Sequence, residues 1–457
     1  MSDIRGPVHL VGIGGMHMSA IGQLLMERGV RVSGSDIRPS PMIDKLVGLG
    51  ATVAYSHAAE NVPADTALVV TTAAAADENP ELVEARRRGI EILLRAEMVA
   101  KLMEGKRVVA VSGAHGKTTT SSLIALILVR AGKEPMYLLG GESLDLGGHA
   151  AWGNGDICVV EADEYKRAFH EYTPDIAVIT NVEPDHLDYY GTAEAYSEAF
   201  VEFGKKVREG GLILACADDP GARYVSDVLG DDLLQHETYG IEGVRYWMAR
   251  GIALSGNGVD FEVTRGGTAV GMLHARVPGE HFVRNALAAT AVALHLEVPF
   301  DVIRSAVAEF RGARRRFETV GESGDVLVMD DYAHHPTEVK ATIAAAIRAF
   351  PERRIIGIYQ PHTYSRISYL WDDWLTCWNG LDGLIVLETY AAREVPLPGR
   401  SAKDLAAAIT GVDTVYASDF DDAAVKAKEL SRPGDVVFTI GAGDVVEVGP
   451  KLLELLR

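Results

Sequence analysis

Short apolar runs alternate with helical stretches along most of this sequence, and this alternation constrains the fold more than any other feature. In the first hundred residues VHLVGIG is followed by MSAIGQLLMERG, and then come VRVSGSD, ALVVTTAAA and IEILLR at the spacing of βα units. Connections of this kind predict parallel strands with helices on both faces of the sheet. We therefore expect an α/β protein built on doubly wound sheets.

Breaks in the alternation predict three domains over the 457 residues. The segment KLMEGKR ends the first series, RVVAVSGAHGKTTT opens a second, and the basic segment RGARRRFE precedes a third. The expected domains are a Rossmann-like domain over 1–105, a central P-loop ATPase-type α/β domain over 106–313 and a C-terminal Rossmann-like domain over 314–457. Within the second, residues 240–275 predict antiparallel strands, followed by a helix from about Val283 to His295.

Charge and composition exclude several classes of protein. The formal charge of −20 argues against a chain that coats nucleic acid or anionic lipid. No apolar run approaches the ~18 residues of a membrane span, and the N-terminus resembles no secretory signal, so we expect a cytoplasmic protein without membrane insertion. The cysteines are widely spaced, which predicts reduced, structural thiols at Cys158, Cys216 and Cys377.

The strongest local signal is GAHGKTTT, residues 113–120, between the strand RVVAVS and a helix that starts at Lys117. This order directs backbone N–H groups and the helix dipole at a polyphosphate. Lys117 offers a cation and Thr118 a Mg²⁺ ligand, although Val111 replaces the first glycine of the usual motif. His115 is as easily a plain loop residue. The predicted nucleotide-binding residues of this loop are Gly113, Ala114, His115, Gly116, Lys117, Thr118 and Thr119.

A glycine-rich turn, GIGGMHMSAIG, follows the first strand. It fails the dinucleotide fingerprint because His17 stands at its last glycine position, and a nicotinamide dehydrogenase is therefore disfavoured. Gly14 and Gly15 still offer N–H donors to a diphosphate, and Asp36 ends the second strand, where a ribose-binding carboxylate belongs. A tight turn without a ligand is the plain alternative.

Polar residues also follow the strands of the predicted second domain. Glu161 closes one strand, and Asp185, His186 and Asp188 follow another. The carboxyl ends of parallel strands share one edge of a sheet, so Glu161, His186 and Thr118 are expected to converge on Mg²⁺ or Mn²⁺ beside the phosphates. Taken alone, the DHLD segment is a solvated loop.

The third domain opens with two polar segments. Arg314–Arg316 lies next to VMDDYAHHPTE, in which Asp331 and His334 follow a strand, and QPHTYSR ends in Arg366. The arginines are as easily solvent-facing as part of a cationic lid over phosphates, and Arg366 is suited to clamp a carboxylate.

These motifs, in this order, resemble the Mur ligases over essentially the whole chain. The resemblance rests on GIGGMHMSAIG, SGSD, GAHGKTTT, EADE, TNVEPDHLDYY, RRRFE, DDYAHHPTE and QPHTYSR. It implies an ATP-dependent ligase that joins L-alanine to the lactyl carboxylate of UDP-N-acetylmuramate through an acyl phosphate, in peptidoglycan precursor synthesis. The implied alternative is the family member that attaches a tripeptide to the same sugar during wall recycling. A non-catalytic nucleotide-binding regulator is disfavoured by the intact Lys117, Glu161 and His186.

The resemblance also implies roles for single residues. The turn from Gly14 and Gly15 to Ser19 would cover the diphosphate, with Asp36 near the uridine. ATP would meet Lys117, Thr118, Asn285, Arg316 and Asp331, and the metal would be held by Thr118, Glu161 and His186. The incoming amino acid would meet His334, which would accept its proton, and Arg366. The sequence departs from the family pattern at His17, Ala114, Phe282, Thr363 and Val201, the last where sister ligases carry a carbamylated lysine.

Overall fold

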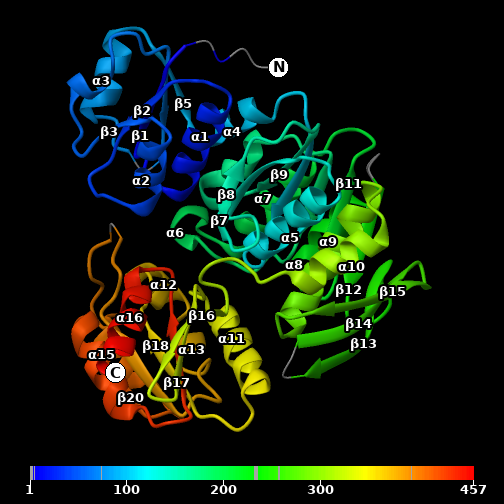
Figure 1. Ribbon diagram of the computed structural model, residues 1–457, viewed down its shortest axis with the longest axis vertical. Coiled ribbons are helices and arrows are strands. Elements are labelled where there is room, and N and C mark those ends of the chain that lie inside the picture. Colours follow the sequence, from blue (N-terminus) through cyan, green and yellow to red (C-terminus); the bar gives the residue numbers. More distant parts are fainter. Residues whose placement is uncertain (1–3, 5, 74, 231–234, 256–257, 393) are drawn as a thin grey trace. The chain divides into compact units, whose positions relative to one another are not determined.

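The apolar runs predicted as strands form three separate sheets in the computed structural model, which describes residues 4, 6–73, 75–230, 235–255, 258–392 and 394–457 (Figure 1). The three sheets confirm the predicted α/β class. The chain divides into two compact units, and the first two sheets lie mainly in one of them, formed by Met1–Ala249, Val263–Gly271 and Arg284–Val307. The other unit, formed by Arg250–Glu262, Met272–Val283 and Ala308–Arg457, holds the third sheet.

The first sheet is parallel and has the strand order β3-β2-β1-β4-β5. Helix α1 follows the glycine-rich turn and ends at Glu27. Two residues later Gly29 takes a left-handed φ of 78°, which stops the helix. The strands are β1 (Val8–Val11), β2 (Val32–Ser35), β3 (Thr52–Ala54), β4 (Leu68–Thr71) and β5 (Glu91–Leu94), and the helices are α1 (Met16–Glu27), α2 (Pro41–Gly48), α3 (Pro80–Arg87) and α4 (Arg95–Met103), with a 3-10 turn at Ala59–Asn61.

The central sheet has ten strands in the order β15-β14-β13-β12-β11-β10-β6-β9-β7-β8. Its strands are β6 (Arg107–Ser112), β7 (Met136–Ser143), β8 (Gly148–Ala151), β9 (Ile157–Glu161), β10 (Ile176–Ile179), β11 (Leu212–Cys216), β12 (Gln235–Gly240), β13 (Trp247–Ser255), β14 (Gly258–Arg265) and β15 (Thr268–Ala275). Its helices are α5 (Lys117–Arg130), α6 (Leu187–Tyr190), α7 (Ala193–Gly204), α8 (Pro220–Leu229), α9 (Glu280–His295) and α10 (Phe300–Glu309), with the 3-10 segment η2 (Tyr165–Glu171).

Strand β6 lies between β10 and β9, and the pairing of all three is parallel. Every residue of β9 and β10 is buried, as in a sheet covered on both faces. The chain therefore delivers the loop after Ser112, the carboxylate of Glu161 and the loop after Ile179 to one edge of the sheet, as the sequence predicts.

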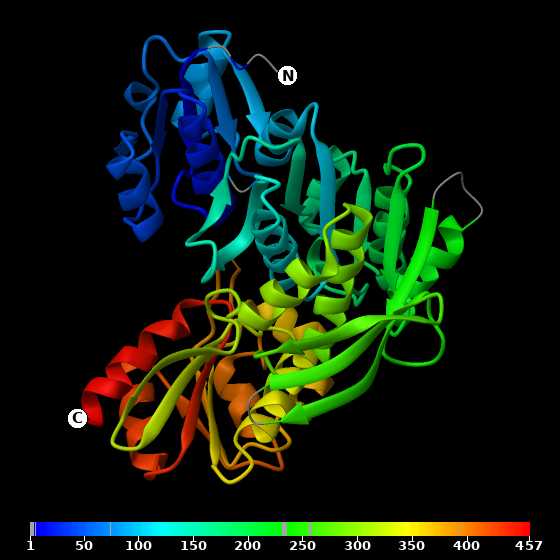
Figure 2. The same cartoon turned by 45° about the vertical axis from the view of Figure 1, so that its right-hand side comes forward.

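The far end of the central sheet consists of long strands, drawn as green arrows in Figure 2. β14 and β15 are sheet neighbours joined only by Gly266 and Gly267, which requires the predicted antiparallel pairing. β12, by contrast, pairs in parallel with β11 and with β13, where Tyr239 lies opposite Trp247. Within the predicted antiparallel range of 240–275, β13 therefore has a parallel partner on its β12 side, and α9 begins three residues before Val283.

The third sheet has the order β16-β17-β21-β18-β19-β20, and all its pairings are parallel except that of β16 with β17. Two apolar cores lie within this unit, one around Trp374 and Trp378 and the other around Val328 and Val437. Its strands are β16 (Glu318–Ser323), β17 (Val326–Asp331), β18 (Ile355–Tyr359), β19 (Gly383–Leu387), β20 (Thr414–Ala417) and β21 (Val436–Ile440); its helices are α11 (Pro336–Ala349), α12 (Tyr364–Tyr369), α13 (Trp371–Trp374), α14 (Ala402–Ala408), α15 (Phe420–Leu430) and α16 (Val448–Leu455), with a 3-10 turn at Asp444–Glu447.

The helices of the described chain are either short or interrupted by polar residues. None of them combines the length and the apolar character that a bilayer crossing requires.

Candidate functional site

The loop between β6 and α5 needs its glycines. Gly113 has a φ of 136°, and a Cβ there would lie 2.0 Å from the Thr180 hydroxyl oxygen, so no larger residue fits. Gly116, with a φ of 80°, precedes the first residue of α5, and a Cβ there would lie 2.8 Å from Oδ1 of Asn285. The structure thus brings Asn285 of α9 against the loop.

The loop after β10 fixes the shape of this glycine loop. The Thr180 hydroxyl donates to the carbonyl oxygen of His115 at 2.6 Å, and the amide of Asn181 bonds both the N–H and the carbonyl of His115. The His115 ring lies 3.1 Å from a Glu183 carboxylate oxygen. Ala114 and Thr119, the other predicted loop residues, lie beside this hydrogen-bonded segment and on the first turn of α5, respectively.

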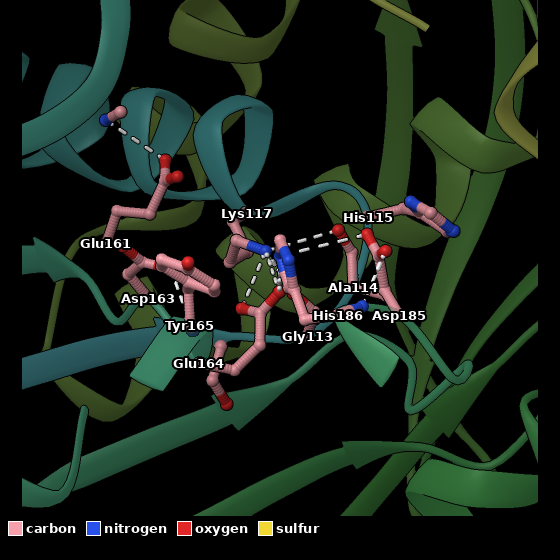
Figure 3. A network of polar contacts seen from close by, with 12 residues as sticks. Gly113, Ala114, His115, Lys117, Glu161, Asp163, Glu164, Tyr165, Asp185 and His186 are labelled. Carbon is pink, nitrogen blue, oxygen red and sulfur yellow. Dashed lines mark hydrogen bonds and ion pairs between the residues drawn. The ribbon is translucent and has the colours of Figure 1, made fainter. Parts of the chain in front are cut away.

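Lys117 directs its ammonium group into the mouth of the loop (Figure 3). It donates to the carbonyl oxygens of Gly113 and Ala114, and it forms an ion pair with Glu164 at 2.9 Å. Burial opposes the charge on Lys117, but the carboxylates of Glu164 and Glu161 outweigh it and raise the pKa of Lys117 above its usual value. The lysine is therefore a fixed cation at the place where polyphosphate charge would lie.

The predicted metal ligands lie around this lysine. The Thr118 hydroxyl donates to Glu161 at 2.8 Å, and Nε2 of His186 lies 3.8 Å from Glu164. Among the described residues, neither Glu161 nor His186 belongs to a group of three His, Cys, Asp or Glu side chains whose ligand atoms all lie within 4.8 Å of one another. An ion held by both would therefore need further oxygens from water or phosphate, which is how Mg²⁺ is usually bound.

A second charged group lies next to Lys117. Arg95, the first residue of α4, forms an ion pair with Asp163 at 2.8 Å. Burial opposes the charge on Asp163, but Arg95 outweighs it and lowers the pKa of Asp163 to about 2. Burial, assisted by Arg95, lowers the pKa of His17 to about 3, so this imidazole is neutral. The glycine-rich turn of the first sheet is thereby linked through His17 to the residues around Lys117.

The glycine-rich turn bonds mostly within the protein. The Gly14 N–H donates to a carboxylate oxygen of Asp36 at 2.9 Å, and the Gly15 N–H donates to the carbonyl of Gly12 at 3.2 Å. Ser19 is buried, and its hydroxyl lies 3.2 Å from His149 of β8, which joins α1 to the central sheet. The N–H groups that remain for a diphosphate are those of the first turn of α1.

The second unit brings its own predicted residues together. Asp331, at the end of β17, accepts hydrogen bonds from the N–H groups of Ala333 and Phe317 at 2.8 and 2.9 Å. Burial nevertheless raises the pKa of Asp331 to about 6, against the opposite effect of Arg316. Burial opposes the charge on Arg316 in turn, but Glu338 and Asp331 raise the pKa of the guanidinium.

Glu338 of α11 organises the rest of this cluster. One of its carboxylate oxygens lies 3.2 Å from Arg316, and the other lies 3.2 Å from Nδ1 of His334, which also lies 3.0 Å from the Tyr332 carbonyl. The buried Arg366 contacts Nδ1 of His362 at 2.9 Å, and the His334 and His362 rings are 6.2 Å apart. His334 and Arg366, both expected near an amino acid, thus share one neighbourhood.

Sequence reasoning missed Glu164, Asp163, Arg95 and Glu338. Glu164 and Asp163 lie inside the EADE motif and Glu338 ends DDYAHHPTE, so acidic residues next to a predicted metal ligand or strand end were the available signal. Arg95 had no such signal, because its partner is 68 residues away along the chain.

A helix that begins at Lys117, behind a loop that only glycine permits, defines an α/β protein of the P-loop type. The chain belongs to the Mur ligase family. Three descriptions of that family match it in order: "Mur ligase family, catalytic domain" at residues 7–107, "Mur ligase middle domain" at 111–293 and "Mur ligase, glutamate ligase domain" at 315–443.

Individual relatives agree with this assignment. The UDP-N-acetylmuramate–L-alanine ligase of Syntrophotalea carbinolica is 42% identical over 98% of both chains. Among solved structures, the UDP-N-acetylmuramate-alanine ligase of Thermotoga maritima has a TM-score of 0.81 and 28% identity over 98% of each chain. A murein peptide ligase of Psychrobacter arcticus has a TM-score of 0.75 and 25% identity, covering 99% of this chain and 98% of its own.

Proposed function

We propose that this chain is an ATP-dependent ligase that joins L-alanine to the lactyl carboxylate of UDP-N-acetylmuramate, a step of peptidoglycan precursor synthesis. The observation that carries the proposal is the fixed Lys117 ammonium between the glycine loop and Glu164, next to the Thr118–Glu161 hydrogen bond. The name of the relative that is 42% identical over nearly the full chain supports the choice of substrates.

In the first step, a carboxylate oxygen of the sugar attacks the γ-phosphorus of ATP. The bond between that phosphorus and the bridging oxygen breaks, and the products are an acyl phosphate and ADP. Both reactants are anionic, so the step depends on positioning and on neutralisation of charge. Lys117 supplies a cation to the phosphates, and the N–H groups at the start of α5 supply further donors.

A divalent cation, Mg²⁺ or Mn²⁺, fits the donors on this edge of the sheet. The Thr118 hydroxyl, the Glu161 carboxylate and the His186 imidazole would hold it, with water and phosphate oxygens completing its shell. When bound, the ion neutralises phosphate charge and polarises the phosphoryl group.

In the second step, the amine of L-alanine attacks the acyl carbon, a C–N bond forms, and phosphate leaves. The amine must give up a proton, and His334 would take it. Its Nδ1 faces the Tyr332 carbonyl and Glu338, contacts that orient the imidazole, and Nε2 would accept the proton. Arg366 would pair with the carboxylate of the amino acid.

The test is release of phosphate from ATP in the presence of UDP-N-acetylmuramate, with L-alanine, L-serine, glycine or the cell-wall tripeptide added in turn. We expect amide formation, detected by mass spectrometry, to be fastest with L-alanine and to require the nucleotide sugar. A product formed with the tripeptide but not with L-alanine would instead assign the chain to wall recycling.

The metal assignment predicts that Glu161→Gln and His186→Asn raise the Mg²⁺ concentration needed for half-maximal turnover. Both side chains are proposed to hold the ion, so binding of UDP-N-acetylmuramate should change far less. Mg²⁺ titrations of each variant make this measurement, with the exposed Glu171→Gln as the control. If the variants need the same Mg²⁺ concentration as the parent, these residues are not metal ligands.

A further inference from the structure

The segment after Glu164 adopts a backbone conformation that is unusual for its residues. Lys166 and Arg167 are consecutive and both left-handed, with φ and ψ of 52° and 29°, and of 57° and 28°. Side chains other than glycine are disfavoured in this region, so such pairs persist only where the surroundings enforce them, and they gather at functional sites.

The surroundings here do enforce it. The Tyr165 N–H donates to Asp163 at 3.0 Å, and Asp163 is itself held by Arg95. The Lys166 ammonium donates to the carbonyl of Ala73 at 3.0 Å, and Arg167 is paired with Glu202. Contacts with three different segments thus hold the strained turn, which indicates that the side-chain position it fixes has a function.

The turn fixes the position of one aromatic ring, that of Tyr165. Tyr165 lies with its ring centroid 4.8 Å from that of His186 and 6.3 Å from that of Tyr189, and the tyrosines remain 37% and 43% exposed. Nε2 of His186 in turn lies 3.8 Å from Glu164, the partner of Lys117. Two accessible rings therefore border the reacting end of the site.

We propose that Tyr165 and Tyr189 form an aromatic platform that binds the hexosamine ring of UDP-N-acetylmuramate. The proposal rests on the ligase function proposed above. The attacking carboxylate is attached to the hexosamine, so this sugar is the substrate group next to the reacting end of the site. A pyranose face presents C–H groups that pack on the electron-rich face of an aromatic ring. The Lys166 ammonium lies 5.7 Å from the Tyr165 ring centroid and donates to the carbonyl of Ala73, just beyond β4. A cation at this position suits a diphosphate attached to that sugar.

The experiment is calorimetric binding of two ligands, UDP-N-acetylmuramate and UDP, to the full chain without ATP. Because UDP lacks the sugar, Tyr165→Ala should raise the Kd for UDP-N-acetylmuramate about tenfold and leave the Kd for UDP unchanged. Tyr189→Ala should shift the same constant in the same direction. Tyr165→Phe keeps the ring and should bind like the parent, and Tyr224→Ala, at a tyrosine 50% exposed on α8, is the matched control.

The outcomes separate the platform from the ligase function. The platform is overturned, even when the parent forms the amide, if Tyr165→Ala and Tyr189→Ala both leave the Kd for UDP-N-acetylmuramate unchanged. It is also overturned if they raise the Kd for UDP by the same factor as the Kd for UDP-N-acetylmuramate. If the parent forms no amide, but Tyr165→Ala and Tyr189→Ala weaken the binding of UDP-N-acetylmuramate and not that of UDP, the platform stands and the ligase function fails. A parent that binds neither ligand overturns both. Circular dichroism of each variant confirms that it is folded.

Discussion

The ion pair of Lys117 with Glu164 is the residue-scale feature on which the proposed chemistry depends most. Replacement of Lys117 by alanine removes one cation from the developing charge of phosphoryl transfer, and loss of a single such group costs ~10²–10³-fold in kcat. We expect a folded variant with at least this loss, measured by phosphate release at saturating ATP. The exposed Lys205→Ala, 88 positions further along the chain, should keep the parent rate. A Lys117→Ala enzyme of normal kcat would contradict the assignment.

Asp331 predicts a pH dependence. Its pKa is raised to about 6, so this carboxylate, which the family resemblance implies at ATP, is protonated below that pH. We expect kcat/KM to fall about tenfold for each pH unit below 6, since kcat/KM reports the ionisation of the free enzyme. Rates between pH 5 and 8 measure this effect.

Asp331→Asn provides the check on that profile. The variant should be slow at every pH and should lack the limb near pH 6. A limb that persists unchanged in the variant belongs to another group.

At the scale of elements, α3 is fastened to the first sheet by Glu81. This fully buried carboxylate accepts hydrogen bonds from Ser35 at 2.6 Å and Asn61 at 2.8 Å, and it lies 3.0 Å from a nitrogen of His57 and 3.6 Å from one of His9. Burial opposes its charge, but these contacts outweigh burial and lower the pKa of Glu81 to about 2.

The lowered pKa of Glu81 fixes the sign of its effect on stability. The contribution is fully present above pH ~4.5, the ordinary value, and is lost as the pH falls toward 2. Glu81→Gln should therefore lower the free energy of unfolding by about 1–3 kcal/mol at pH 7 and lose this acid dependence. Thermal unfolding at pH 7 and pH 3 measures both effects. The exposed Glu78→Gln should match the parent, and equal stability of the two variants at pH 7 would refute this role.

The sequence predicted the elements better than it predicted their partners. The periodicity of apolar residues and the positions of glycines were enough to predict β6, the glycine loop and the start of α5 at Lys117, because these features depend on neighbours in the chain. The parallel pairing of Tyr239 with Trp247 and the contact of Arg95 with Asp163 depend on segments that only the folded sheet brings together. For the same reason, the motif EADE revealed Glu161 but not that Glu164 holds Lys117.

At the scale of the whole molecule, two units with separate apolar cores predict two unfolding transitions. The glycine loop lies in the first unit. A non-hydrolysable ATP analogue with Mg²⁺, at a hundred times its Kd, should stabilise that unit by about 2.7 kcal/mol. Differential scanning calorimetry measures this effect. A single transition would show that the units unfold together, and an unshifted transition of the first unit would contradict nucleotide binding at the glycine loop.

The three buried thiols give each unit its own chemical tag. Cys158 and Cys216 lie in the first unit and Cys377 in the second, and burial raises the pKa of Cys158 to about 12, that of Cys216 to about 11, and that of Cys377 well above its usual value. The reactive thiolate is thus suppressed until the surrounding core opens. Alkylation during a thermal ramp, followed by peptide mass mapping, would record in a single tube which unit opened first and how often.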